Sequence, residues 1–206
     1  MSTYYTMKGY IEDETERADL STYVLRYIKS AITFYENERF YFNEERAVMD
    51  TITAAEYYAL PTDFQKLDAL IIEENSVKST LTAKPWAWIE EMSRSSYTAK
   101  PTYYALYRGE LRLYPIPNKV YPVSMGYVKR FETLSATNDT NAWLTDAERM
   151  IRSFAKAELY THKIKGPDSA KIAADLRGYA EDERKALQAE SAKRTQLGVV
   201  IPWGVI

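Results

Sequence analysis

The sequence predicts an α+β protein in which N- and C-terminal helices form an antiparallel bundle and a β-rich domain is inserted between them. Apolar residues recur at helical spacing at both ends of the chain, and β-favouring runs bounded by proline and glycine fill its middle. Helices from both chain ends that pack together leave the middle segment as an insertion. The expected parts are a helical bundle domain (1–37 and 143–197), an inserted β-rich domain (38–142) and an extended C-terminal docking arm (198–206).

The first zone is expected to contain one long helix with a shorter helix before it. Asp19 is a suitable N-cap, because its carboxylate can accept hydrogen bonds from the first free N–H groups of a helix. Met7 and Ile11 predict the shorter helix. The apolar stripe of the long helix comprises Leu20, Val24, Tyr27, Ile28, Ala31 and Tyr35.

The middle zone is expected to form mainly antiparallel strands. Arg108-Gly109-Glu110 predicts a tight turn between two of them. Pro85 predicts a short helix that extends to Ser93, since proline is favoured at the first helical position. Prolines 115, 117 and 122 predict strands that lie at sheet edges or end at those residues. The strand-forming runs are 40–42, 47–53, 67–72, 103–107, 111–114 and 121–128.

The third zone is expected to be helical again. Thr145 and Glu148 have the spacing of a capping box, in which each side chain bonds a free backbone N–H. Gly166-Pro167 separates this helix from the last one, because glycine can end a helix and proline can begin one. The apolar stripe of the last helix comprises Ile172, Leu176, Tyr179, Ala180 and Leu187.

Composition argues against several classes of function. The 206 residues include 18 Tyr and 4 Trp but one His and no Cys, and the net charge is −2. Thiolate catalysis, disulfides and multi-His metal sites are therefore excluded. We expect no catalytic residue, no metal and no cofactor. Because no apolar run of about 18 residues occurs and the first ten residues lack the pattern of a signal peptide, we also expect no membrane segment.

Charge is distributed unevenly within this near-neutral total. Residues 38–75 carry a net charge of −6, and residues 76–131 carry +6. Either the two segments face each other inside one domain, or the acidic side of one copy meets the basic side of the next in a head-to-tail contact. The basic candidates are Lys84, Arg94, Lys100, Arg108, Arg112 and Lys119, and the acidic candidates are Glu44, Glu45, Asp50, Glu73 and Glu74.

The segment after Gly198 has no charged side chain and is rich in β-branched residues. Left uncovered, such a segment promotes aggregation, so we expect it to dock on its own subunit or on another chain. Trp203 is the natural anchor, because aromatic residues dominate interface energetics. The expected docking residues are Val199, Val200, Ile201, Pro202, Trp203, Val205 and Ile206.

Two other functions remain open at this level. A carbohydrate or cell-wall-binding β module would use Trp86 and Trp88, which share a face if they lie on a strand but not if Pro85 begins a helix. A small hydrolase would pair Glu90 or Glu91 with Asp68, and it would need two carboxylates about 5–10 Å apart in a cleft. We expect a protein that is not an enzyme.

An ordered set of short motifs resembles the head-to-tail adaptor (connector) proteins of tailed bacteriophages, particularly short-tailed ones. No single motif is specific, but their order along the chain is. The motifs are 31–36 (AITFYE), 39–44 (RFYFNE), 58–64 (YALPTDF), 67–68 (LD), 101–106 (PTYYAL) and 111–117 (LRLYPIP), followed by 123–127 and a terminal helix pair.

This resemblance implies a structural virion protein whose β-rich domain is inserted in a helical bundle. It implies a ring, usually of twelve copies, that lies below the portal, joins capsid to tail and continues the DNA channel. The implied partners are the portal protein, a downstream tail or nozzle protein, and DNA as cargo only. The implied location is the head–tail interface of the virion, after synthesis in the host bacterial cytoplasm. In this family the C-terminal arm commonly docks on the portal, a role that here would fall to Val199–Ile206.

Overall fold

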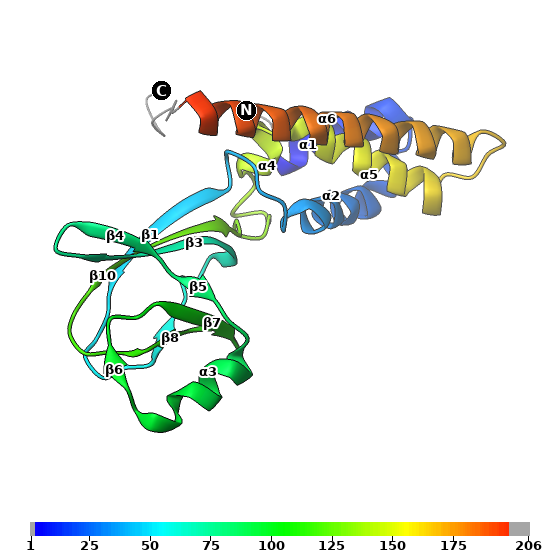
Figure 1. The fold of residues 1–206 in the computed structure, drawn as a ribbon. Helices are drawn as coiled ribbons and strands as arrows, with labels where there is room; N and C mark the ends of the chain where they lie inside the picture. Colours follow the sequence, from blue (N-terminus) through cyan, green and yellow to red (C-terminus); the bar gives the residue numbers. More distant parts are fainter. Residues whose placement is uncertain (1–2, 198–206) are drawn as a thin grey trace. The chain divides into compact units, whose positions relative to one another are not determined.

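The computed structural model describes residues 3–197, and the chain divides into two compact units. The β unit is Glu44–Lys129, and the helical unit is the chain before and after it. Helices and mainly antiparallel sheets make the protein α+β, so the predicted fold class is confirmed at that level (Figure 1). Residues 38–43 and 130–142, which the sequence placed in the inserted domain, belong to the helical unit. The predicted docking arm, 198–206, lies outside the described residues.

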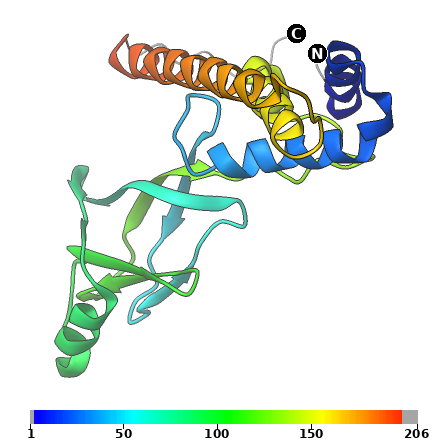
Figure 2. The ribbon, with the colours of Figure 1, turned by 90° about the vertical axis from the view of Figure 1, so that its right-hand side faces the viewer.

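In the helical unit, α6 packs along α5, α5 packs on α2, and α1 packs on both α2 and α5. Figure 2 shows α1 and α6 on opposite sides of α5. Its helices, in chain order, are α1 (Tyr4–Thr15), a 3₁₀ turn (Ala18–Leu20), α2 (Ser21–Tyr35), α4 (Ala142–Thr145), α5 (Glu148–His162) and α6 (Ser169–Leu197).

The central helix α2 forms because its apolar residues recur every three or four positions and so share one face. The predicted stripe is confirmed, since Val24, Tyr27, Ile28, Ala31 and Tyr35 are all buried. Their burial against α5 and α1 provides most of the stability of such a helix, because helical propensity alone is weak.

Three aromatic rings form the centre of the helical core. Trp143, only 1% exposed, meets the rings of Phe40 and Phe42 edge-on, with centroids 5.7 and 5.0 Å away. Phe40 and Phe42 stack on each other at 5.4 Å. The predicted strand at 40–42 is therefore wrong. These residues form an irregular turn, because burying both rings on Trp143 outweighs their intrinsic β preference.

Both predicted N-terminal helix caps are wrong. Asp19 lies inside the 3₁₀ turn and forms an ion pair with Arg17, with Oδ1 2.7 Å from Nε. Thr145 ends the short helix α4, and its hydroxyl donates a hydrogen bond of 2.7 Å to Asp146. Helix α5 then begins at Glu148 without a side-chain cap. In both cases the predicted capping residue lies within a short helical turn, and its side chain bonds a nearby side chain instead of the backbone N–H groups of the following helix.

The stripe of α6 is partly different from the prediction. Ala180 is buried as expected, and so is Ala173, but Tyr179 is 64% exposed. Ser191 is also buried, where its hydroxyl accepts a 2.9 Å hydrogen bond from the backbone N–H of Tyr41. Small residues thus form the buried side of α6, and its one tyrosine points away from the core.

The β unit contains two four-stranded sheets, ordered β1-β10-β3-β4 and β2-β8-β7-β5, and a two-stranded pair, β6-β9. Every pairing is antiparallel except β5-β7 and β6-β9. The elements are β1 (Glu44–Asp50), β2 (Tyr57–Ala59), β3 (Phe64–Glu74), β4 (Val77–Thr80), β5 (Thr82–Ala83), α3 (Trp86–Met92), a 3₁₀ turn (Ser93–Ser95), β6 (Thr98–Ala99), β7 (Tyr103–Tyr107), β8 (Glu110–Tyr114), β9 (Ile116–Pro117) and β10 (Pro122–Lys129).

Alternation along the strands gives the β unit two packed layers. Ile72 and Met125 of one sheet and Leu111 and Leu113 of the other share a buried core. Helix α3 packs on β7, where Ile89 is buried with Ala105. The predicted turn between β7 and β8 is confirmed, since Arg108 and Gly109 both have positive φ (53° and 79°), as a two-residue hairpin turn requires.

Candidate interaction surfaces

The β unit already pairs part of its separated charge internally. Lys119 and Lys100 both approach Glu74, with Nζ–O distances of 2.7 and 3.7 Å. The hydrogen bond from Lys119 is the main cause that lowers the pKa of Glu74. Glu45 pairs with Lys129 at 2.9 Å, which likewise lowers the pKa of Glu45. These contacts match the intradomain interpretation for part of the predicted patches.

Arg112 is the most buried of the predicted basic residues, with its side chain 5% exposed. Its Nη2 donates to Glu56 Oε2 at 2.7 Å, and its Nη1 donates to Glu90. The guanidinium lies over the ring of Tyr57, 5.0 Å from the centroid, and Tyr57 donates its hydroxyl hydrogen to Glu90 at 3.2 Å. This cluster joins β2, β8 and α3, so Arg112 lies inside the unit instead of on a surface patch.

The cluster also bears on the hydrolase alternative. Glu90 is held by Arg112 and Tyr57, and so acts as a structural counter-ion for a buried guanidinium. Among the residues from 3 to 197, no group of three or more His, Cys, Asp or Glu side chains is placed to hold a metal ion. His162 lies in the last turn of α5, with Nε2 3.3 Å from Glu158. The contact of His162 with Glu158 and its place at the C-terminal end of α5 both stabilise the helix.

The remaining predicted patch residues are spread over the β unit. Lys84 lies over the Trp88 ring, with Nζ 5.3 Å from the centroid. The side chains of Arg94, Arg108 and Asp50 are exposed, and those of Glu44 and Glu73 are partly buried. Arg94, Arg108 and Asp50 are therefore exposed charges of the β unit.

The two tryptophans of the carbohydrate alternative lie on helix α3 and pack on its own sheet. Trp86 stacks on Tyr107, with centroids 4.5 Å apart and planes 20° apart. Trp88 meets Tyr103 and Tyr114 edge-on. The two rings thus contact different partners and do not form a shared flat platform.

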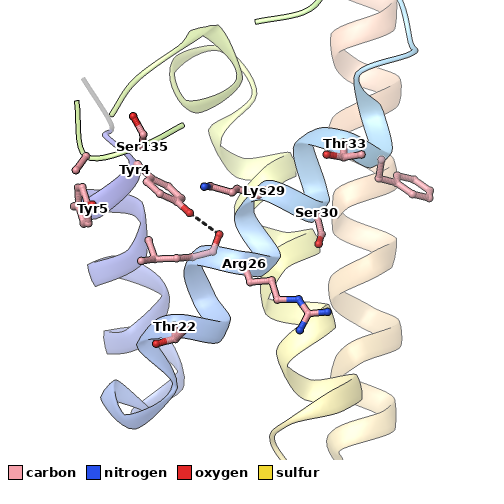
Figure 3. A pocket seen from close by; sticks show the side chains of 11 residues that line it. Tyr4, Tyr5, Thr22, Arg26, Lys29, Ser30, Thr33 and Ser135 are labelled. Carbon is pink, nitrogen blue, oxygen red and sulfur yellow. Dashed lines mark hydrogen bonds between the residues drawn. The ribbon is translucent and has the colours of Figure 1, made fainter. Parts of the chain in front are cut away.

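The helical unit carries an open groove of about 840 Å³ between α1, α2 and the turn at 135–136 (Figure 3). Its apolar lining includes Tyr5, Leu25 and Phe34, and Phe34 is 63% exposed. The Tyr4 hydroxyl donates a 2.8 Å hydrogen bond to the Leu25 carbonyl, which fixes one wall. The remaining lining residues are Thr22, Arg26, Lys29, Ser30, Thr33, Ser135 and Ala136.

The groove is positively charged and suited to binding a protein. Arg26 and Lys29 extend from α2, and Lys29 lies over the Tyr4 ring at 5.6 Å (Figure 3). Within the described part of the chain, the side chain of Arg26 makes neither a hydrogen bond nor an ion pair. An exposed aromatic surface beside unpaired cations is typical of a protein–protein contact. The groove could not be predicted from the sequence, because its lining comes from three segments and shows no local pattern.

Buried tyrosines make the stability of the fold sensitive to alkaline pH. Burial raises the pKa of Tyr4, Tyr35 and Tyr41 from the ordinary 10.0 to about 12, and a hydrogen bond to Asp146 adds to the effect at Tyr41. The pKa of Tyr127 is also raised, mainly by burial and to a lesser extent by its hydrogen bond to Asp63. The folded chain therefore keeps protons that the unfolded chain loses above pH 10.

We expect the free energy of unfolding to fall as the pH rises from 10.0 toward 12, because only the unfolded chain releases these protons in that interval. Urea unfolding at a series of pH values, with tyrosinate absorbance recorded in parallel, measures the effect. In Tyr41→Phe the free energy of unfolding should fall less steeply with pH than in the wild type, once each protein's value at neutral pH is subtracted. A free energy of unfolding that stays constant over this interval would contradict the explanation.

These features define a class of protein. Two packed units with exposed aromatic and charged surfaces are typical of a protein that acts by binding other proteins. None of the helices between residues 3 and 197 is both long and apolar enough to cross a membrane.

The chain matches the protein-family model described as SU10 adaptor protein over residues 2–200, and it belongs to that family. The family is one of phage head-to-tail adaptors, so the resemblance seen in the ordered motifs is confirmed. The protein is therefore a structural phage protein with an adaptor role. No curated protein matches the chain.

Proposed function

We propose that this protein forms a ring beneath the portal of a tailed phage, where it joins the capsid to the tail and continues the DNA channel. The observation that carries the proposal is the family match over residues 2–200. The exposed groove of the helical unit and the aromatic surfaces of the β unit support it, because a ring subunit must contact neighbours on several sides.

The proposed ring contains twelve copies and lies at the head–tail interface of the virion. Its partners are the portal protein on one side and a tail or nozzle protein on the other, and DNA passes through it as cargo. The protein is made in the host bacterial cytoplasm and acts by assembly, without catalysis. The helical domain, the inserted β domain and the segment after residue 197 would each supply a different contact.

Docking on the portal is assigned to Gly198–Ile206, the uncharged segment that follows α6. Apolar side chains gain free energy when a preformed groove removes them from water, and this gain must exceed the cost of ordering the segment. Trp203 is the proposed anchor. The exposed charges Arg94, Arg108 and Asp50 are proposed to contact neighbouring copies.

Deleting Gly198–Ile206 should leave a folded protein that no longer binds portal rings, because the docking side chains are lost. Co-sedimentation with purified portal measures binding, and circular dichroism checks the fold. A variant with glycine and serine at the same nine positions is the matched control for chain length, and it should fail in the same way. Binding of the truncated protein at the wild-type level would overturn the docking assignment.

A further inference from the structure

Helix α6 has an exposed face that the helical core does not use. Tyr179, 64% exposed, is the most exposed large apolar residue of this helix. Asp175 precedes it by four positions and Asp182 follows it by three, so both carboxylates lie on the same helical face as the tyrosine. Ala186, two turns after the tyrosine, is exposed as well, and Asp182 also lies 4.0 Å from the Nζ of Lys185.

The groove between α1 and α2 has the complementary character. It is walled by Tyr5, Leu25 and Phe34, and it carries Arg26 and Lys29. A volume of about 840 Å³ is ample for one aromatic side chain and the helical turn that carries it. Its cations match the acids that flank Tyr179, and its aromatic wall matches the tyrosine ring.

The two surfaces are formed by different helices of the helical unit. Helix α6 contacts α5, whereas the groove is formed by α1, α2 and the turn at 135–136. Figure 3 shows the groove side chains extending from α1, α2 and the segment at Ser135, with α5 and α6 behind these helices. Two different patches that complement each other give a head-to-tail contact, and repetition of such a contact generates a ring if the rotation closes.

We propose that Tyr179 of one copy inserts into the groove between α1 and α2 of the next copy, with Asp175 and Asp182 facing Arg26 and Lys29. The occupant of the groove is thus a second copy of this chain. The proposal rests on the ring in the proposed function and identifies one contact that would hold it together. Tyr179 would be the energetic centre of that contact, as buried tyrosines commonly are.

Tyr179→Ala tests the contact, because an exposed side chain can be removed without loss of the fold. We expect self-association to weaken by about tenfold to thirtyfold, the effect of removing a typical interface anchor. Sedimentation velocity of the free protein and the occupancy of portal rings measure it. Tyr10→Ala, a matched variant at a 45% exposed tyrosine of α1 that does not line the groove, should behave as wild type.

A charge exchange provides a second test. Arg26→Glu should weaken self-association, and Arg26→Glu with Asp175→Lys should restore it to within a few-fold of wild type, because the attraction is re-formed with reversed sign. A double variant no better than Arg26→Glu alone would contradict this pairing.

The outcomes separate this contact from the proposed function. If Tyr179→Ala fills portal rings and self-associates as wild type does, the contact is refuted and the adaptor function stands. If the wild-type protein fails to bind portal rings, the proposed function fails, and self-association of the free protein alone decides the contact. A free wild-type protein that is also monomeric at all concentrations would then refute the contact as well.

Discussion

Replacing Trp143 with alanine should lower the free energy of unfolding of the helical unit by about 4 kcal/mol, the middle of the range for a fully buried tryptophan. Trp143 is 1% exposed and packs edge-on against Phe40 and Phe42. Its removal leaves a cavity at the point where residues 40–43 and α4 meet the helices. Since domains are stable by only about 5–15 kcal/mol, much of the helical unit would unfold at moderate temperature.

Calorimetry and helical circular dichroism during urea unfolding measure this effect. Trp143→Phe, which keeps an aromatic ring, should lose clearly less. Tyr179→Ala is the matched control on an exposed position, and it should change the free energy of unfolding by less than about 0.5 kcal/mol. A Trp143→Ala protein within about 1 kcal/mol of wild type would show that these rings are not the centre of the core.

Arg112→Ala should destabilise the β unit by about 3 kcal/mol, because it leaves two carboxylates without their buried partner. The value lies at the lower end of the range for broken buried pairs, since the Glu90 side chain is 41% exposed and can be rehydrated. The loss should concentrate where α3 meets β7 and β8, because Arg112 ties these elements to Glu56 and Tyr57.

Amide hydrogen exchange read by mass spectrometry gives the local measurement. Protection should fall in 86–92, 103–107 and 110–114, and change little in α5. Arg94→Ala, at an exposed arginine of the same unit, is the matched control and should leave protection unchanged. Equal loss of protection in both variants would contradict a structural role for the Arg112 cluster.

The elements that could be predicted from sequence are those whose residues make local, repeated contacts. Strand β7 has the predicted limits, and the turn at Arg108-Gly109 follows from two residues that accept positive φ. The buried stripe of α2 follows from a single helical period that it keeps throughout. In each case the deciding interaction lies within a few residues along the chain.

The failures share the opposite property. Phe40 and Phe42 are β-favouring residues, but a partner about 100 positions away, Trp143, decides their conformation. Arg112 is predicted as a surface charge, but it is buried in ion pairs with Glu56, which directly precedes β2, and with Glu90 of α3. Tyr179 was placed in the α6 stripe, but the small residues Ala173 and Ala180 allow α6 to approach α5 on a different face. In all three cases, contacts between residues far apart in the sequence determine the structure, and no local sequence pattern predicts such contacts.

The candidate surfaces were predictable to different degrees. The intradomain pairing of the −6 and +6 segments was one of two alternatives, and the contacts of Glu74 with Lys100 and Lys119 support it in part. The groove between α1 and α2 was not foreseen, because its walls come from segments more than 100 residues apart. The family itself was recognisable, since an ordered series of weak motifs is informative when no single one is.

The most direct test of the adaptor function is the mass of purified portal rings after incubation with this protein. The proposal predicts a complex that is heavier than the portal by a fixed number of 23.8 kDa subunits. Electron microscopy of the same complex should show these subunits as a ring stacked on one end of the portal. A portal whose mass is unchanged at saturating concentrations of the full-length protein would contradict the proposed function.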